Sequence, residues 1–174
     1  MTPGHENSRL ATSVELKDMN LQHALWVVLI SMTPIGELRA GVPMAYLHYG
    51  FPWYSAFLLC LLGNLLPIPF ILIFLDPISR LLSKVKLFDR IIKWVFERTR
   101  RRGKKIERVE GIGLAIFVGI PLPGTGAWTG ALLAFLLGME RKRAFFYIAL
   151  GVLIADIIVT AVCVAGYQTY LWLE

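Results

Sequence analysis

Apolar residues fill four long stretches of the chain, and proline–glycine clusters interrupt two of them. The interrupted stretches are Leu21–Tyr49 and Gly113–Gly138, whereas Trp53–Leu75 and Ala144–Tyr167 contain no such cluster. The latter two have 23 and 24 residues, enough for a helix across a hydrocarbon core of about 30 Å. The pattern predicts an all-α, polytopic integral membrane protein with two transmembrane helices.

Composition agrees with a membrane protein. Of the 174 residues, 56% are hydrophobic and only 17% are charged, whereas soluble domains have about 25% charged residues. Cys60 and Cys163 lie in separate apolar stretches without the spacing of metal ligands, and the three histidines are scattered. We therefore expect two small buried hydrophobic side chains at the cysteines, no metal site and no cofactor.

The two halves of the membrane part repeat each other. An offset of 89 residues aligns Pro34 with Pro123 and Gly41 with Gly130, and an offset of 88 aligns Gly50 with Gly138 and Gly63 with Gly151. We predict a first repeat over residues 21–75 and a second over 111–174, each with an interrupted stretch followed by an uninterrupted one. Residues 1–20 form a polar N-terminal tail without the basic start of a signal peptide.

Basic residues indicate how the halves insert. The linker Asp76–Glu110 carries twelve basic and five acidic residues, and the short loop Met139–Arg143 is basic as well, so we expect both to be cytoplasmic. Taken alone, an interrupted stretch is compatible with one kinked spanning helix or with a re-entrant hairpin. Because Gly113–Gly138 would begin and end on the cytoplasmic side, it is predicted to be a hairpin.

These assignments together predict an inverted-topology repeat. The re-entrant hairpins cover residues 21–49 and 113–138, and the transmembrane helices cover 53–75 and 144–167. The protein would be a multi-pass protein of the cell (cytoplasmic or inner) membrane. Its hairpin tips would meet near the bilayer midplane.

The linker has its own pattern. Apolar residues recur in it at helical spacing with basic residues between them, which predicts an amphipathic helix on the cytoplasmic face. Contact with anionic lipid headgroups is expected for Arg98, Arg100, Arg101, Arg102, Lys104 and Lys105. The alternative is a solvated charge run that only fixes topology. No base-reading chemistry accompanies these residues, so we expect no nucleic acid partner.

Three ionisable residues fall inside the apolar stretches, namely Glu37, Arg39 and Asp156. Such residues usually mark transport pathways or proton relays. Since two carboxylates face one guanidinium, one acid would lack a fixed partner and would tend to hold a proton. Glu37 or Asp156 is the candidate for proton exchange. In the structural alternative, Arg39 only clamps the first tip through one of these carboxylates.

The second tip carries no charge but is rich in glycine. With Pro34 of the first tip, the candidate substrate- and proton-binding residues there are Pro123, Gly124, Thr125, Gly126 and Trp128. We expect Thr125 to cap a helix running from Gly126 towards Leu137, whose positive N-terminus would suit an anionic group together with Arg39. Gly126 and Gly130 alternatively form a small-residue packing face. Pro67 and Pro69 are candidate hinge residues, or merely packing residues, in the first transmembrane helix.

Two motifs resemble those of a known family. Gly36-Glu-Leu-Arg-Ala-Gly-Val-Pro43 and Pro121-Leu-Pro-Gly-Thr-Gly-Ala-Trp-Thr-Gly-Ala131 resemble the two signatures of the small multidrug export protein family, and the resemblance covers about residues 25–165. That family is similar in layout to DedA-type (VTT-domain) membrane proteins. This likeness implies paired re-entrant hairpins, proton-dependent transport and flipping of phospholipids or polyprenyl phosphate carriers.

Three functions are compatible with the sequence. The first is a proton-coupled secondary transporter that exports small amphipathic compounds through a midplane site at the two tips. The second is a flippase for phospholipid or polyprenyl-phosphate lipids, and the third is a non-transporting membrane scaffold. No enzyme motif is present. Expected partners are membrane lipid, protons, an amphipathic or anionic lipid substrate, and further copies of the chain in a homodimer or larger oligomer that shields the irregular tips.

Overall fold

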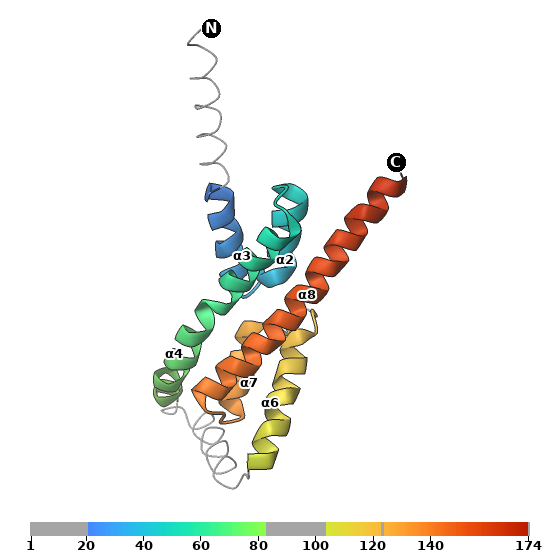
Figure 1. Ribbon diagram of the computed structural model, residues 1–174. Coiled ribbons are helices and arrows are strands. Elements are labelled where there is room, and N and C mark those ends of the chain that lie inside the picture. The colour runs from blue at the N-terminus through green and yellow to red at the C-terminus, as the bar shows by residue number, and fades with distance from the viewer. Residues whose placement is uncertain (1–20, 83–103, 123, 174) are drawn as a thin grey trace, which may run out of the picture.

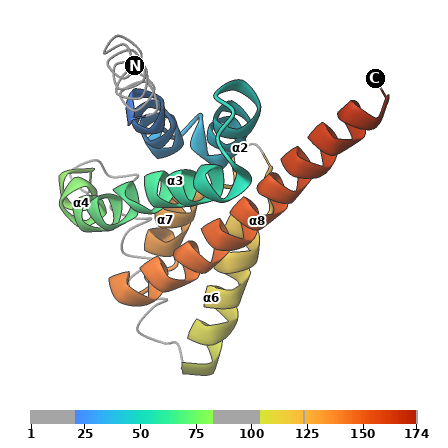
Figure 2. The same ribbon diagram turned by 45° about the horizontal axis from the view of Figure 1, so that its top comes forward.

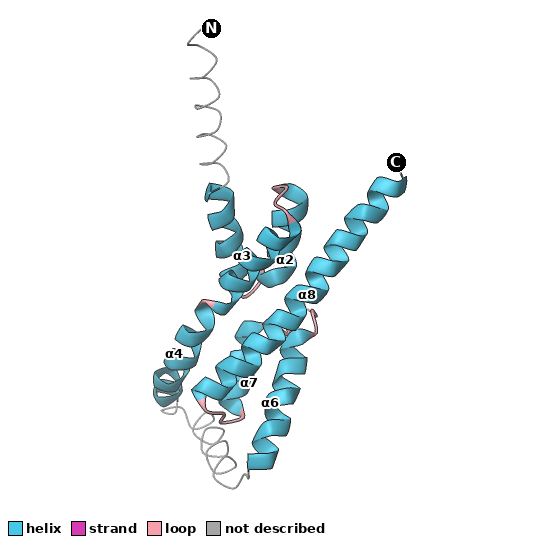
Figure 3. Cartoon of the chain, in the orientation of Figure 1, coloured by secondary structure: helices cyan, strands magenta, loops and turns pink. Residues whose placement is uncertain are grey.

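The computed structural model describes residues 21–82, 104–122 and 124–173 (Figure 1). This described part consists of helices and the turns between them and contains no strand (Figure 3). In chain order the helices are Leu21–Met32, α2 (Glu37–Pro43), the π-helical turn η1 (Met44–His48), α3 (Trp53–Leu65), α4 (Pro67–Leu82), α6 (Lys104–Gly119), α7 (Ala127–Leu136) and α8 (Arg141–Leu173). The predicted all-α class is confirmed.

Two helical segments of the described part are long and apolar enough to cross a membrane. They are Trp53–Leu75, with 23 residues, and Arg141–Tyr170, with 30 residues, which correspond to about 35 and 45 Å of helix. The first has the predicted bounds. The second begins before the predicted Ala144 because the basic residues after Glu140 form its first turn instead of a loop.

Each half places two short helices before its long one. Leu21–Met32 has twelve residues and α7 has ten, or about 18 and 15 Å, which is too short to cross a core of about 30 Å. The chain reverses direction at residues 33–36 in the first half and between α6 and α7 in the second (Figure 1). At the far end of the first pair, the rings of His23 and Tyr49 stack with centroids 4.2 Å apart.

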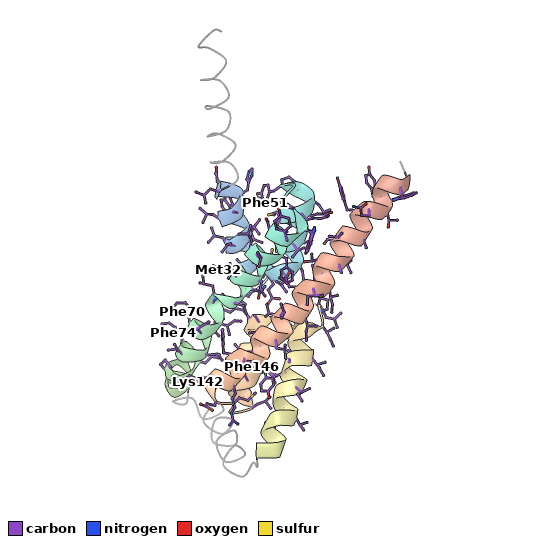
Figure 4. The ribbon with its side chains drawn as sticks, in the orientation of Figure 1. Met32, Phe51, Phe70, Phe74, Lys142 and Phe146 are labelled. Atoms are coloured by element: carbon purple, nitrogen blue, oxygen red, sulfur yellow. The ribbon has the colours of Figure 1, made fainter. Side chains whose placement is uncertain are left out.

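The ends of the helices gather at two ends of the molecule. The end of α4 and the starts of α6 and α8 lie at one end, whereas the start of Leu21–Met32 and the end of α8 lie at the other (Figures 1 and 2). Lys142 and Phe51 lie towards these two opposite ends (Figure 4). The two halves therefore cross the molecule in opposite directions.

Helix α8 is the centre of the fold, because α2, α3, α4, α6 and α7 all pack against it. Alanine is the commonest of the buried hydrophobic residues, while leucine, isoleucine and phenylalanine side chains are common among the exposed ones. An apolar exterior of this extent matches a lipid environment better than water.

Glycines allow the closest helix contacts, and they do so in matching places. A Cβ atom on Gly41 would lie 2.9 Å from Cys60 Sγ and would overlap Ser31, and one on Gly130 would meet Val118 and Ile148. In the long helices, a Cβ on Gly63 would lie 2.8 Å from the Val28 carbonyl oxygen, and one on Gly151 would lie 2.7 Å from that of Ala115.

The first long segment is divided at Leu66, between α3 and α4. Pro67 and Pro69 lack the amide hydrogens that would bond to the carbonyls of Gly63 and Leu65, which explains why the helix is interrupted there. The Leu66 amide keeps its bond to the Leu62 carbonyl at 3.0 Å, so the interruption is local.

Several predicted features lie outside the described residues. These are the polar tail over residues 1–20, most of the amphipathic linker, Pro123, and the basic residues Arg98, Arg100, Arg101 and Arg102. Of the remaining basic residues assigned to lipid contact, Lys104 and Lys105 begin α6.

Candidate functional site

The turn of the first half is held by a threonine and ends in a strained residue. Thr33 Oγ1 donates to the Ile30 carbonyl at 2.7 Å and accepts from the Gly36 amide at 3.0 Å. Glu37 follows with a φ of 45°, the only positive φ at a non-glycine residue in the described part. Such a backbone costs about 1–3 kcal/mol and persists only where surrounding contacts hold it.

The turn of the second half is organised by Thr125. Its hydroxyl lies 2.6 Å from the Ile120 carbonyl, to which it can donate, and it accepts from the Leu122 amide at 3.2 Å. Gly124 has a φ of 87°, which favours glycine. Pro34, at the opposite turn, and Gly124 are both exposed at the outside of their turns.

The predicted cap by Thr125 is wrong. Gly126 is the N-cap of α7, and its amide donates at 2.9 Å to Oγ1 of Thr129, which in turn donates to the Gly126 carbonyl at 3.0 Å. Thr125 is turned away from α7 because its hydroxyl is used within the turn and by Arg39.

The remaining amides at the start of α7 are bound by a residue of the other half. The Glu37 carboxylate lies at Gly126 and faces the backbone amides of Ala127 and Trp128, the first two residues of α7, within reach of hydrogen bonds from them. A carboxylate at a helix N-terminus is stabilised by the free amides and by the helix dipole. A Cβ atom on Gly126 would overlap both oxygens of this carboxylate, so only glycine leaves room for it.

Arg39 connects the two turns. Its Nη2 atom donates to Thr125 Oγ1 at 3.2 Å and lies 4.0 Å from Oε2 of Glu37. The Glu37 side chain is only 10% exposed and that of Arg39 is 28% exposed. Arg39 therefore offsets the charge of a largely buried carboxylate while fixing the second turn.

Trp128 makes the reciprocal connection. Its Nε1 atom donates to the Met32 carbonyl at 3.0 Å, across from α7 to the end of the first short helix. Thus Arg39 of α2 contacts the second turn, and Trp128 of α7 contacts Met32, directly before the first turn. The offset of 89 residues aligns these two side chains.

Between the turns lies a cavity of only about 10 Å³, close to the space needed by one water molecule. Glu37, Arg39, Thr125 and Gly126 line it, together with apolar residues of α6 and α8. It is also lined by Asn64, which is 1% exposed and whose Nδ2 atom has no hydrogen-bond partner among the described residues. Sequence reasoning gave Asn64 no role, although a polar amide inside an apolar stretch was a usable signal.

Asp156 is fully buried in α8 but does not line this cavity. Its Oδ1 atom lies 3.5 Å from Thr160 Oγ1, and Oδ2 has no hydrogen-bond partner among the described residues. Glu37 and Arg39 are therefore brought together as predicted, whereas Asp156 forms a separate buried group.

Beside the polar cavity is an apolar groove of about 770 Å³. It runs between α4 and α7, and its lining residues are Met32, Leu66, Pro67, Phe70, Ile71, Phe74, Leu75, Trp128, Thr129 and Leu132. Figure 4 shows Met32, Phe70 and Phe74 following one another along this side of the molecule. Trp128 and Thr129, in the first turn of α7, place the groove next to the Glu37 contact.

The described residues contain no group of three or more His, Cys, Asp or Glu side chains arranged to hold a metal ion. Comparison with curated proteins gave no match, and comparison with solved structures gave none. A family model described as Putative small multi-drug export protein matches residues 37–158, more than half of the chain. This match begins at Glu37 and takes in Arg39, the second turn and Asp156. The chain therefore belongs to the small multi-drug export protein family.

Proposed function

We propose that this membrane protein is a proton-coupled secondary transporter that exports small amphipathic compounds. The observation that carries the proposal is the meeting of the two turns, where Glu37 of the first half binds the start of α7 in the second. Interrupted segments whose helix ends converge on a buried charge are typical of transporter binding sites. The family description names export, which supports outward movement of the substrate.

The site would lie near the bilayer midplane, at the tips of two re-entrant hairpins. Short helices of about 15–18 Å reach half of a core of about 30 Å, so a turn at their ends would come to rest near its middle. Since lipid offers no hydrogen bonds, the irregular turns need protein around them, and each turn here contacts the other.

Paired contacts favour an inverted-topology repeat. Gly63 lies against the carbonyl of Val28 in the first half, and Gly151 lies against the carbonyl of Ala115 in the second. Each partner belongs to the first short helix of its own half. The same packing therefore occurs twice in halves that cross the molecule in opposite directions (Figure 1).

The orientation follows from the basic residues. The start of α6 at Lys104 and the start of α8 at Arg141 lie at one end of the molecule, the end that we assign to the cytoplasm (Figure 1). The protein would then be a multi-pass protein of the cell membrane with its linker on the cytoplasmic face.

The apolar groove suits the hydrophobic part of a substrate. It is close in size to common ligand pockets of about 300–1,000 Å³ and adjoins the polar site through Trp128. The same groove favours the second candidate function, lipid flipping. An acyl chain would lie in the apolar groove on the outside of the helices while the headgroup enters the polar site.

Transport by the purified protein in liposomes with an imposed pH gradient tests the proposal. Gradient-driven accumulation of fluorescent amphipathic compounds is expected for the wild type and is expected to be lost in Glu37→Gln and Asp156→Asn. Glu140→Gln is the matched control, since Glu140 forms only an exposed ion pair with Arg143 at 3.5 Å. Unchanged transport in both site variants would contradict proton coupling through these acids.

A sidedness assay separates the two candidate functions. Fluorescent phospholipids and polyprenyl-phosphate analogues in the same liposomes are exposed to dithionite, which quenches only the outer leaflet. Protein-dependent movement of these lipids, without transport of the small compounds, would assign the flippase function instead.

A further inference from the structure

Resting on the proposed transport site, we infer that Glu37 is a built-in occupant of an oxyanion site and that the anionic group of an amphipathic ligand binds by displacing it. The ligand class is therefore an amphipathic compound with a phosphate or carboxylate group.

The groups around the Glu37 carboxylate are hydrogen-bond donors. They are the amides of Ala127 and Trp128 at the start of the ten-residue helix α7, and the Arg39 guanidinium 4.0 Å away. Free amides at a helix start together with an arginine are a common binding arrangement for phosphate and carboxylate groups. A side chain of the protein fills this position, just as a ligand oxyanion would.

A second observation points independently to a ligand. Asn64 lines the same cavity from α3, is 1% exposed, and its Nδ2 donor has no partner among the described residues. A buried donor without a partner destabilises the protein, because it has lost its hydrogen bonds to water and gained none. The two oxygens of Glu37 thus leave the Nδ2 donor of Asn64 without an acceptor. A larger oxyanion, with three or four oxygens, would have a further oxygen to accept from Asn64.

The strained backbone at Glu37 fits a residue that must leave its position. With a φ of 45°, the Glu37 backbone is strained, and its contacts with α7 offset that strain. Displacement would free the backbone of that strain. The groove beside Trp128 would then hold the apolar part of the same ligand.

Oxyanion binding by site variants in lipid nanodiscs tests the inference. With inorganic phosphate as the probe, Glu37→Gln is expected to bind about tenfold more tightly than the wild type, because the competing charge is gone while the donors remain. Glu37→Gln with Arg39→Gln is expected to lose the gain. Glu140→Gln, which removes an exposed carboxylate elsewhere, is expected to match the wild type.

A second variant separates the site from general electrostatics. A methyl group at residue 126 would overlap the position of the Glu37 oxygens, so it would also exclude a ligand oxygen. Glu37→Gln with Gly126→Ala has the same net charge as Glu37→Gln alone, yet it is expected to bind phosphate no better than the wild type. Equal binding by these two variants, or no gain in Glu37→Gln relative to wild type, would overturn the inference.

Two further arms identify the source of the anion. Nanodiscs of neutral lipid are compared with nanodiscs containing phosphatidic acid, while a short-chain alkyl phosphate is added in solution. Competition with phosphate by phosphatidic acid alone assigns a lipid headgroup, and competition by the alkyl phosphate assigns a soluble amphipathic anion. Phosphate binding is measured in nanodiscs, without transport. A protein that does not transport could therefore still bind phosphate as inferred, and a protein that transports could still fail to bind it.

Discussion

Glu37 and Gly126 touch across the two halves of the chain, and the missing side chain of the glycine is what allows the carboxylate to reach α7. The two residues are 89 positions apart, the offset that aligns the second arms of the halves. Equivalent positions meet each other at a two-fold axis, so a pseudo-two-fold axis of the proposed inverted repeat would pass through this contact.

Gly126→Ala is expected to lower the free energy of unfolding by about 1–3 kcal/mol, because the new methyl group overlaps the Glu37 carboxylate. Thermal unfolding in detergent measures the change. Gly113→Ala is the control, since a Cβ atom there meets nothing within 4 Å. Glu37→Ala should remove much of the penalty of Gly126→Ala, and an equal loss with and without Glu37 would refute the contact.

Ser31→Ala is expected to change stability by less than about 1 kcal/mol, because the neighbour of the buried Ser31 hydroxyl is the Cys60 thiol, a weak hydrogen-bond partner. The same change should reduce the cost of Gly41→Ala, since the Cβ atom at Gly41 overlaps Ser31 Oγ. Relief should be partial because Cys60 Sγ is also close. A double-mutant cycle in detergent checks this, and strict additivity would count against it.

Thr125→Val is expected to lower stability by about 1–3 kcal/mol and to slow transport, because the Leu122 amide and Arg39 both lose the hydroxyl that accepts from them. Thr125→Ser keeps that hydroxyl and should retain most of both properties. Unfolding midpoints and initial rates in liposomes report the two effects. Val and Ser variants that behave alike would show that the hydroxyl does not hold the second turn.

Single cysteines at Gly50 and Lys142 are expected to react with a membrane-impermeant maleimide from opposite sides of the membrane, after Cys60 and Cys163 are replaced by alanine. Lys105, at the start of α6, should react from the same side as Lys142. Intact cells and inside-out vesicles give the two sides. Labelling of Gly50→Cys and Lys142→Cys from one side would exclude the proposed topology.

The helices form where apolar residues run without interruption, so the sequence predicted the all-α class and the location of the two long apolar segments. The stretch Trp53–Leu75 is long and apolar enough to cross a membrane, as predicted, although α4 itself continues past Asp76 and Pro77 to Leu82. The start of α8 was predicted three residues late, since basic residues can form the first turn of a helix whose side chains reach the membrane surface.

The site was harder to predict, because its contacts join residues that are far apart in the chain. Sequence reasoning paired Glu37 with Arg39 correctly, but it could not show that the carboxylate binds α7, which is nearly ninety positions away. It predicted Thr125 as the cap because this threonine precedes the start of the helix, whereas the path of the turn places Gly126 at the cap and pairs it with the Thr129 hydroxyl. The oligomeric state stays a prediction.

The interruption at Leu66 has a mechanical consequence. Pro67 and Pro69 remove two backbone hydrogen bonds, so bending the segment there would break fewer bonds than bending an uninterrupted helix. The aromatic side chains of Phe70 and Phe74 are carried on the part beyond this point. A small rotation of α4 would therefore change the width of the groove while α3 keeps Asn64 in place. The groove could then open for the apolar chain of a ligand without a change in the residues that would bind its polar group.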